Sequence, residues 1–266
     1  MRRIAAPLCA IVAGAALLAG CGGSSGPSSA GSGSPSASKS ASVTGTINVF
    51  AAASLQEAFT KLGTQFEAAH PGTKVVFNFG PSTGLAEQIG QGAPADVFAS
   101  ASTKTMDQVV SAGDAANPTN FVSNTMEIAV PPKNPAHINK LGDLAKKGVK
   151  VALCQADVPC GATALKVFDN AKIKVTPVTQ EVDVKSTLSK VTLGEVDAGV
   201  VYVTDVRAAG ASVKGIEIPA NVNASTTYPI APITASKNKT TAQAFVAYVL
   251  SPDGLAALTA AGFSKP

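Results

Sequence analysis

Short apolar segments that favour β-strands alternate with segments of helical periodicity over most of this chain. The strand-like runs lie at 47–50, 74–79, 96–99, 149–153, 199–203 and 216–218. Segments between them repeat apolar residues every three or four positions, as one face of a helix does; these are 55–66, 85–89, 162–168 and 185–193. This alternation predicts an α/β fold with largely parallel sheets.

The part of the chain that carries this pattern, residues 47–266, is 220 residues long. That is long for one compact domain and suits two lobes of about 100 to 150 residues, each with its own core.

The first 46 residues have a different composition. An apolar stretch of about 15 residues follows two arginines, which suits a cleaved signal peptide and is short for a membrane span. Leu18-Ala19-Gly20-Cys21 resembles a bacterial lipobox, so we expect residues 1–20 to be a lipoprotein signal peptide and Cys21 to be acylated, which would anchor the protein to the outer face of the cell membrane. An ordinary secretory signal is the alternative. Residues 21–46, rich in serine and glycine, predict a disordered tether.

Charge and cysteine content narrow the possible functions. Removing the two arginines of the signal from the 21 basic residues leaves 19, against 17 acidic ones, with no basic run. Nucleic acid is therefore not an expected partner. Once Cys9 and Cys21 are set aside, Cys154 and Cys160 remain, and in an oxidising compartment such a pair favours a disulfide. A zinc site is the alternative, but neither histidine has ligand spacing to the cysteines, and we expect no metal-ligating residues.

Ligands of open α/β sheets bind beyond the carboxyl ends of the strands, where helices begin. The first such junction is Phe50-Ala51-Ala52-Ala53-Ser54-Leu55. Ser54 and Glu57 also fit a capping box, and from this motif alone a helix cap is the favoured interpretation of Ser54.

The second junction, Gly80-Pro81-Ser82-Thr83-Gly84, matches the G-x-S-x-G pattern of esterases. An esterase would need a histidine after Ser82, and only His137 follows it, in a proline-rich stretch. Because no credible base is available to activate Ser82, the esterase hypothesis is remote, and we expect no catalytic residues.

Several segments taken in order resemble the molybdate-binding proteins of ABC importers. They are 50–55, 85–89, Gly92-Ala93-Pro94-Ala95-Asp96-Val97-Phe98, 158–161, 183–184, 199–202 and 261–263, and they span essentially residues 47–266. The resemblance implies a two-lobed type II periplasmic-binding-protein fold with two crossover segments. We expect lobe 1 to comprise 47–128 and 225–266, and lobe 2 to comprise 129–224.

The resemblance also implies a set of ligand-binding residues. Ser54 and Ser82 match serines that donate hydroxyl and backbone N–H groups to the oxyanion, and Thr83 is an alternative to Ser82. Cys160 and Val184 match positions that donate backbone N–H groups only, and Tyr202 matches a tyrosine whose hydroxyl completes the cage. Tyr228 and Tyr248 are expected to serve packing.

The function implied is capture of molybdate, and of the nearly isosteric tungstate, by an extracytoplasmic binding protein without catalytic activity or cofactor. The implied partners are the permease and the ATPase of the importer, and we expect a monomer. A smaller oxyanion such as sulfate is the alternative ligand.

Overall fold

The structure, a computed structural model, describes residues 42–266, so the predicted signal peptide and Cys21 lie outside the described residues. The strands are β1 (Gly45–Ala52), β2 (Thr73–Gly80), β3 (Val97–Ala99), β4 (Thr119–Val130), β5 (Val151–Cys154), β6 (Thr179–Glu181), β7 (Ala198–Tyr202), β8 (Lys214–Glu217) and β9 (Ser225–Pro232). The α-helices are α1 (Gln56–Ala69), α2 (Ser82–Gly90), α3 (Thr103–Ser111), α4 (Pro159–Ala171), α5 (Val184–Thr192), α6 (Val203–Ala209), α7 (Lys239–Val249) and α8 (Pro252–Ala261). Short 3₁₀ helices are η1 (Ala53–Leu55), η2 (Leu141–Ala145) and η3 (Gly210–Ser212).

The strands form one mixed sheet in the order β2-β1-β3-β9-β4-β7-β5-β6, with β8 paired to β4. The long strand β4 divides this sheet into two parts. Its residues up to Thr125 pair with β9, and from Met126 onward they pair with β7 and β8. We call residues 45–125 and 225–266 lobe 1, and residues 126–224 lobe 2. The boundary predicted at 128/129 falls within the same strand.

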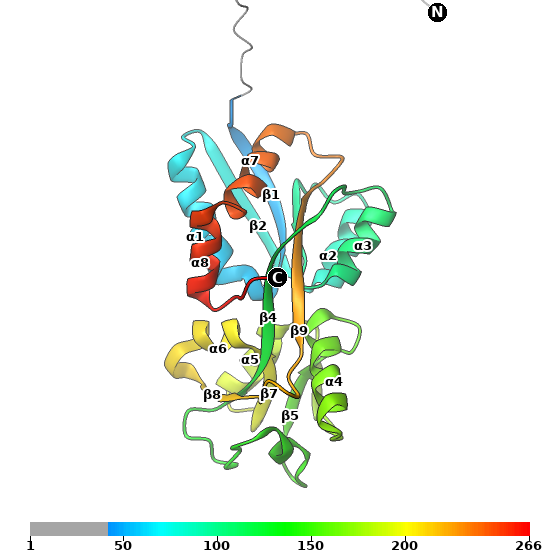
Figure 1. The fold of residues 1–266 in the computed structure, drawn as a ribbon, viewed down its shortest axis with the longest axis vertical. Helices are drawn as coiled ribbons and strands as arrows, with labels where there is room; N and C mark the ends of the chain where they lie inside the picture. Colours follow the sequence, from blue (N-terminus) through cyan, green and yellow to red (C-terminus); the bar gives the residue numbers. More distant parts are fainter. Residues whose placement is uncertain (1–41) are drawn as a thin grey trace, which may run out of the picture. The chain divides into compact units, whose positions relative to one another are not determined.

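Each lobe has its own apolar core. In lobe 1, helices α1, α7 and α8 cover one face of the sheet, and α2 and α3 cover the other (Figure 1). Lobe 2 has one continuous core, to which β5, β7, α4 and α5 contribute. The two crossovers are β4 itself and the segment that leads into β9, which lies antiparallel beside β4 (Figure 1).

The α/β class and the two-lobed type II fold with two crossovers are confirmed, but the expectation of largely parallel sheets is wrong. Four strand pairings are parallel, and the four that involve β4 or β9 are antiparallel. The crossing strands run back and forth between the lobes and therefore cannot be parallel to each other.

The fold also begins earlier than the predicted end of the tether at residue 46. Gly45 and Thr46 pair with β2, and the backbone N–H of Thr44 donates to Thr241 Oγ1 at 3.2 Å. These contacts bring Thr44, Gly45 and Thr46, the last residues of the predicted tether, into lobe 1.

Among residues 42–266, no single helix is long and apolar enough to cross a membrane; α7 and α8 pass that test only as a pair, with a bend of 59° between them.

Candidate functional site

The five predicted ligand-binding residues all line one buried cavity. They come from five different strand-to-helix junctions: Ser54 after β1, Ser82 after β2, Cys160 after β5, Val184 after β6 and Tyr202 at the end of β7. The first two belong to lobe 1 and the other three to lobe 2, so the cavity lies between the lobes. All five residues are buried. Thr83, the alternative to Ser82, does not line the cavity.

The cavity is small. About 20 Å³ is open to the centre of a water-sized sphere, and a single water needs about 10 to 15 Å³ on that measure. Its size suits one compact inorganic ion rather than an organic substrate.

Backbone donors converge on this cavity because several helices begin there. The N–H groups in the first turn of a helix have no acceptor within the helix, and the helix dipole places partial positive charge at that end. The starts of η1, α2 and α4 have no side-chain cap. Their N–H groups are therefore suited to an anion in the cavity.

The two serine hydroxyls are held by neighbouring groups. The backbone N–H of Ala101 donates to Ser82 Oγ at 3.0 Å, which leaves the hydroxyl proton of Ser82 free to be donated. Ser54 Oγ lies 2.8 Å from the Tyr228 hydroxyl. When Tyr228 is the donor in this bond, the proton of Ser54 is also free for a ligand.

The Tyr202 hydroxyl is buried and has no hydrogen-bond partner among residues 42–266. Burial raises the pKa of this phenol well above its ordinary value, so the group remains a neutral donor. A buried polar group without a partner costs about 1 to 3 kcal/mol. Because Tyr202 lines the cavity, a ligand there would be a natural acceptor for this hydroxyl.

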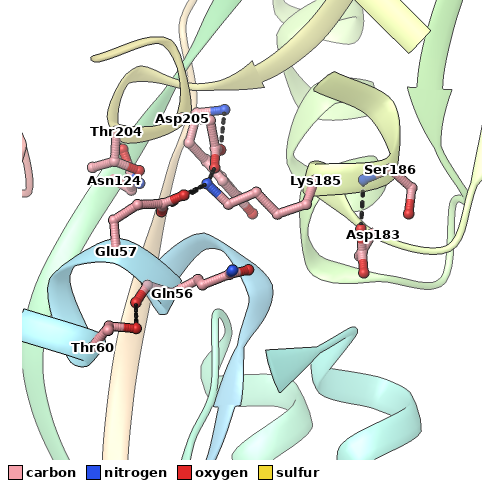
Figure 2. Close-up of polar contacts among 10 residues, drawn as sticks. Gln56, Glu57, Thr60, Asn124, Asp183, Lys185, Ser186, Thr204 and Asp205 are labelled. Carbon is pink, nitrogen blue, oxygen red and sulfur yellow. Dashed lines mark hydrogen bonds and ion pairs between the residues drawn. The ribbon is translucent and has the colours of Figure 1, made fainter. Parts of the chain in front are cut away.

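No lysine, arginine or histidine lines the cavity, and its one acidic residue is engaged elsewhere. Asp183 accepts a hydrogen bond from the backbone N–H of Ser186 at 2.8 Å and so caps α5 (Figure 2). The site is thus rich in neutral donors and poor in acceptors. Within residues 42–266, no three side chains of His, Cys, Asp or Glu gather as metal ligands do.

Cys154 and Cys160 form a disulfide, as the sequence suggested. It joins the end of β5 to the first turn of α4, the turn that brings Cys160 to the cavity. The disulfide therefore fixes the backbone of one wall of the site.

The favoured interpretation of Ser54 as a helix cap is wrong, and the structure gives no support to the esterase alternative at Ser82. Ser54 caps neither η1 nor α1, and Glu57 pairs with Lys185 of lobe 2, so the two residues form no capping box. Ser82 has no histidine beside it in the cavity, where an esterase would need its base. In both cases contacts distant in sequence determine the role of the serine.

The sequence analysis missed two contributors to the site. Tyr228 packs in the core of lobe 1, as expected, but its hydroxyl also bonds to Ser54. Ala101, just after β3, lines the cavity and holds Ser82. Its position after a buried strand was the only signal that could have indicated it.

Comparison with known proteins agrees with this geometry. A sequence model described as "Bacterial extracellular solute-binding protein" matches residues 47–264. The chain belongs to this family. Its relatives include the molybdate-binding protein ModA of Mycobacterium tuberculosis, 43% identical over 222 residues, which cover 83% of this chain and 85% of the relative. The molybdate-binding protein ModA of Escherichia coli is 32% identical over 241 residues, with 83% and 89% covered.

A solved structure shows the same fold. The periplasmic molybdate-binding protein of Azotobacter vinelandii superimposes with a TM-score of 0.74 at 22% identity, covering 83% of this chain and 99% of that one. Family membership makes this chain a solute-binding protein and not an enzyme, as the sequence analysis predicted.

Proposed function

We propose that this solute-binding protein captures molybdate outside the cytoplasm for an ABC importer. The observation that carries the proposal is the buried hydroxyl of Tyr202, which has no partner among the described residues and belongs to a residue that lines the cavity together with other neutral donors. The 43% identity to a molybdate-binding protein supports the choice of anion.

The donor set fits a tetrahedral dianion. Molybdate carries no proton at neutral pH, so its four oxygens only accept hydrogen bonds. A monoprotonated phosphate would need an acceptor, and the cavity offers one carboxylate, Asp183, whose Oδ1 is used to cap α5. Neutral donors stabilise the anion without a fixed opposite charge that would slow its release.

We propose six donors to the anion. The hydroxyls of Ser54, Ser82 and Tyr202 act together with the first-turn N–H groups of Ser82, Cys160 and Val184. At about 1.5 to 3 kcal/mol for each charge-assisted bond, they supply roughly 9 to 18 kcal/mol before the costs of dehydration and closure. A net value of about 8 to 12 kcal/mol corresponds to micromolar to nanomolar affinity.

Calorimetric titration of the exported protein with molybdate, tungstate, sulfate and phosphate tests the proposal. We expect molybdate and tungstate to bind far more tightly than sulfate, because their longer bonds to oxygen enlarge the anion and a rigid cage is sensitive to size. Phosphate should bind weakest. Sulfate binding as tight as molybdate binding would support the smaller-oxyanion alternative instead.

We also propose that Cys21 is acylated and anchors the protein to the outer face of the cell membrane. There the protein, as a monomer, delivers the anion to the permease and ATPase of the importer. The lipobox-like sequence and the following tether support this anchoring. Replacing Cys21 by serine should release the protein into the soluble fraction. Equal membrane retention of the two proteins would contradict acylation.

A further inference from the structure

One lysine joins the two lobes beside the anion cavity. Lys185 Nζ lies 2.8 Å from both carboxylate oxygens of Glu57 and 3.1 Å from Asp205 Oδ1. Figure 2 shows the lysine reaching between these two carboxylates. Lys185 directly follows Val184, one of the residues that line the cavity.

The two contacts of this lysine differ in kind. Lys185 on α5 and Asp205 on α6 both belong to lobe 2, so their ion pair does not depend on how the lobes sit. Glu57 lies on α1 of lobe 1, so its contact with Lys185 requires the lobes to be together. The contact with Asp205 thus positions Lys185 within lobe 2, whereas the contact with Glu57 forms only when the two lobes are together.

The exposure of the three side chains agrees with this difference between the two contacts of Lys185. The Asp205 side chain is fully buried, that of Lys185 is 21% exposed and that of Glu57 is 52% exposed. Burial alone lowers the pKa of Lys185, but the carboxylates of Asp205 and Glu57 more than offset this and raise its pKa above the ordinary value. Asp205 also accepts the backbone N–H of Tyr202 at 3.1 Å, which ties the lysine to the strand end that carries a proposed ligand donor.

We propose that the Glu57–Lys185 ion pair is a latch that forms when the lobes close and slows escape of the bound anion. Neither side chain lines the cavity. They therefore act on retention rather than by contact with the anion, and this role rests on the proposed function of the cavity. Asp205 is the positioning residue that keeps Lys185 directed towards lobe 1.

The chain offers a closely matched control. Lys190 and Glu195 form an ion pair of 2.7 Å, and their side chains are 33% and 48% exposed. Both residues belong to lobe 2, so this pair does not respond to closure. Glu57→Gln and Glu195→Gln thus remove the same charge from similar surroundings, but only the first removes a contact between lobes.

The experiment measures molybdate dissociation from the wild type and both variants by stopped-flow chase at low and high salt. We expect Glu57→Gln to raise the dissociation rate about 2- to 10-fold at low salt and to remove most of its salt dependence, since ion pairs at partly exposed sites are modest and screened. Glu195→Gln should match the wild type. Thermal unfolding without anion should not separate the two variants.

A double substitution tests whether the effect passes through the lysine. In a Lys185→Met background, Glu57→Gln should leave the dissociation rate unchanged. An unchanged rate in Glu57→Gln alone, or equal changes in the two glutamine variants, would overturn the latch. If the wild type bound no molybdate, the proposed function would fail instead. Small-angle scattering of the anion-free proteins would then test closure of the lobes alone: a larger radius of gyration for Glu57→Gln would show that the ion pair holds the lobes together, and equal radii would overturn the latch.

Discussion

Replacing Tyr202 by phenylalanine tests the site most directly. The substitution removes one hydroxyl and keeps the ring, whose centroid lies 6.2 Å from that of Tyr228 in an edge-on arrangement. No residue in 42–266 meets the geometry of a hydrogen bond to this hydroxyl, although Thr163 and Tyr228 lie close enough to shift its pKa, so its loss should cost the fold little. The effect on binding can thus be separated from the effect on folding.

The expected magnitude follows from the lost donor. An anion that loses a charge-assisted hydrogen bond in a buried cavity should bind about 1.5 to 3 kcal/mol more weakly, which is roughly 10- to 150-fold in dissociation constant. The thermal midpoint of the anion-free protein should stay the same or rise slightly, because an unpaired buried hydroxyl stabilises nothing.

Calorimetry with molybdate and thermal unfolding without it measure the two quantities. Tyr248→Phe is the control, since Tyr248 lies on α7 and packs against Phe66 outside the cavity. Wild-type affinity in Tyr202→Phe would refute the assignment of this hydroxyl to the anion. A loss of anion-free stability as large as the loss of affinity would show that the hydroxyl serves the fold.

Three further predictions concern neighbouring residues. Ser54→Ala should weaken molybdate binding about 10-fold, and Tyr228→Phe should weaken it less, since the serine remains but loses its partner; calorimetry that shows wild-type affinity in Ser54→Ala would place the anion elsewhere. Replacing both Cys154 and Cys160 by alanine should lower the free energy of unfolding in urea by about 2 kcal/mol on the loop-length model, and mass spectrometry should find no free thiols in the exported wild type. Burial raises the pKa of Asp205 to about 6 from 3.8, so the folded protein holds this proton more tightly than the unfolded chain, and the resulting stability is lost as pH rises from about 4 to about 6. Thermal unfolding across this range should show a smaller decline with pH in Asp205→Asn than in the wild type, and parallel curves would contradict the shift.

The sequence predicted those parts of the fold that local pattern determines. Strands β1, β2 and β5 lie within a few residues of the predicted runs, because short apolar segments followed by helical periodicity are strong local signals. Strand β4 was not predicted, and neither β4 nor β9 was identified as a crossover. Their role as crossovers depends on pairing across the whole chain, and the 12-residue β4 belongs to both lobes.

The candidate site shows the same limit. The five lining residues were proposed from a family resemblance, and each lies where a strand ends and a helix begins, as the general rule for α/β sheets requires. The contacts that surround them could not be predicted. Ser54 bonds to a residue 174 positions away, and Glu57 bonds to one 128 positions away, so the local capping motif gave the wrong role to both.

The sharing of β4 between the lobes also bears on how the chain folds as it is made. Lobe 2 is continuous in sequence, whereas the core of lobe 1 needs residues from both ends, including Phe59 near its start and Tyr228, Phe245 and Phe263 near the C-terminus. Contacts this far apart in sequence form late, because a long loop must close first. We therefore expect the core of lobe 2 to form first. The early strands of lobe 1 keep unpaired edges until β9, α7 and α8 have been synthesised. If synthesis stalls after lobe 2, the edge of β3 that pairs with β9 in the complete protein is exposed to other chains. Because lobe 2 is inserted within the sequence of lobe 1, such incomplete chains are prone to aggregate.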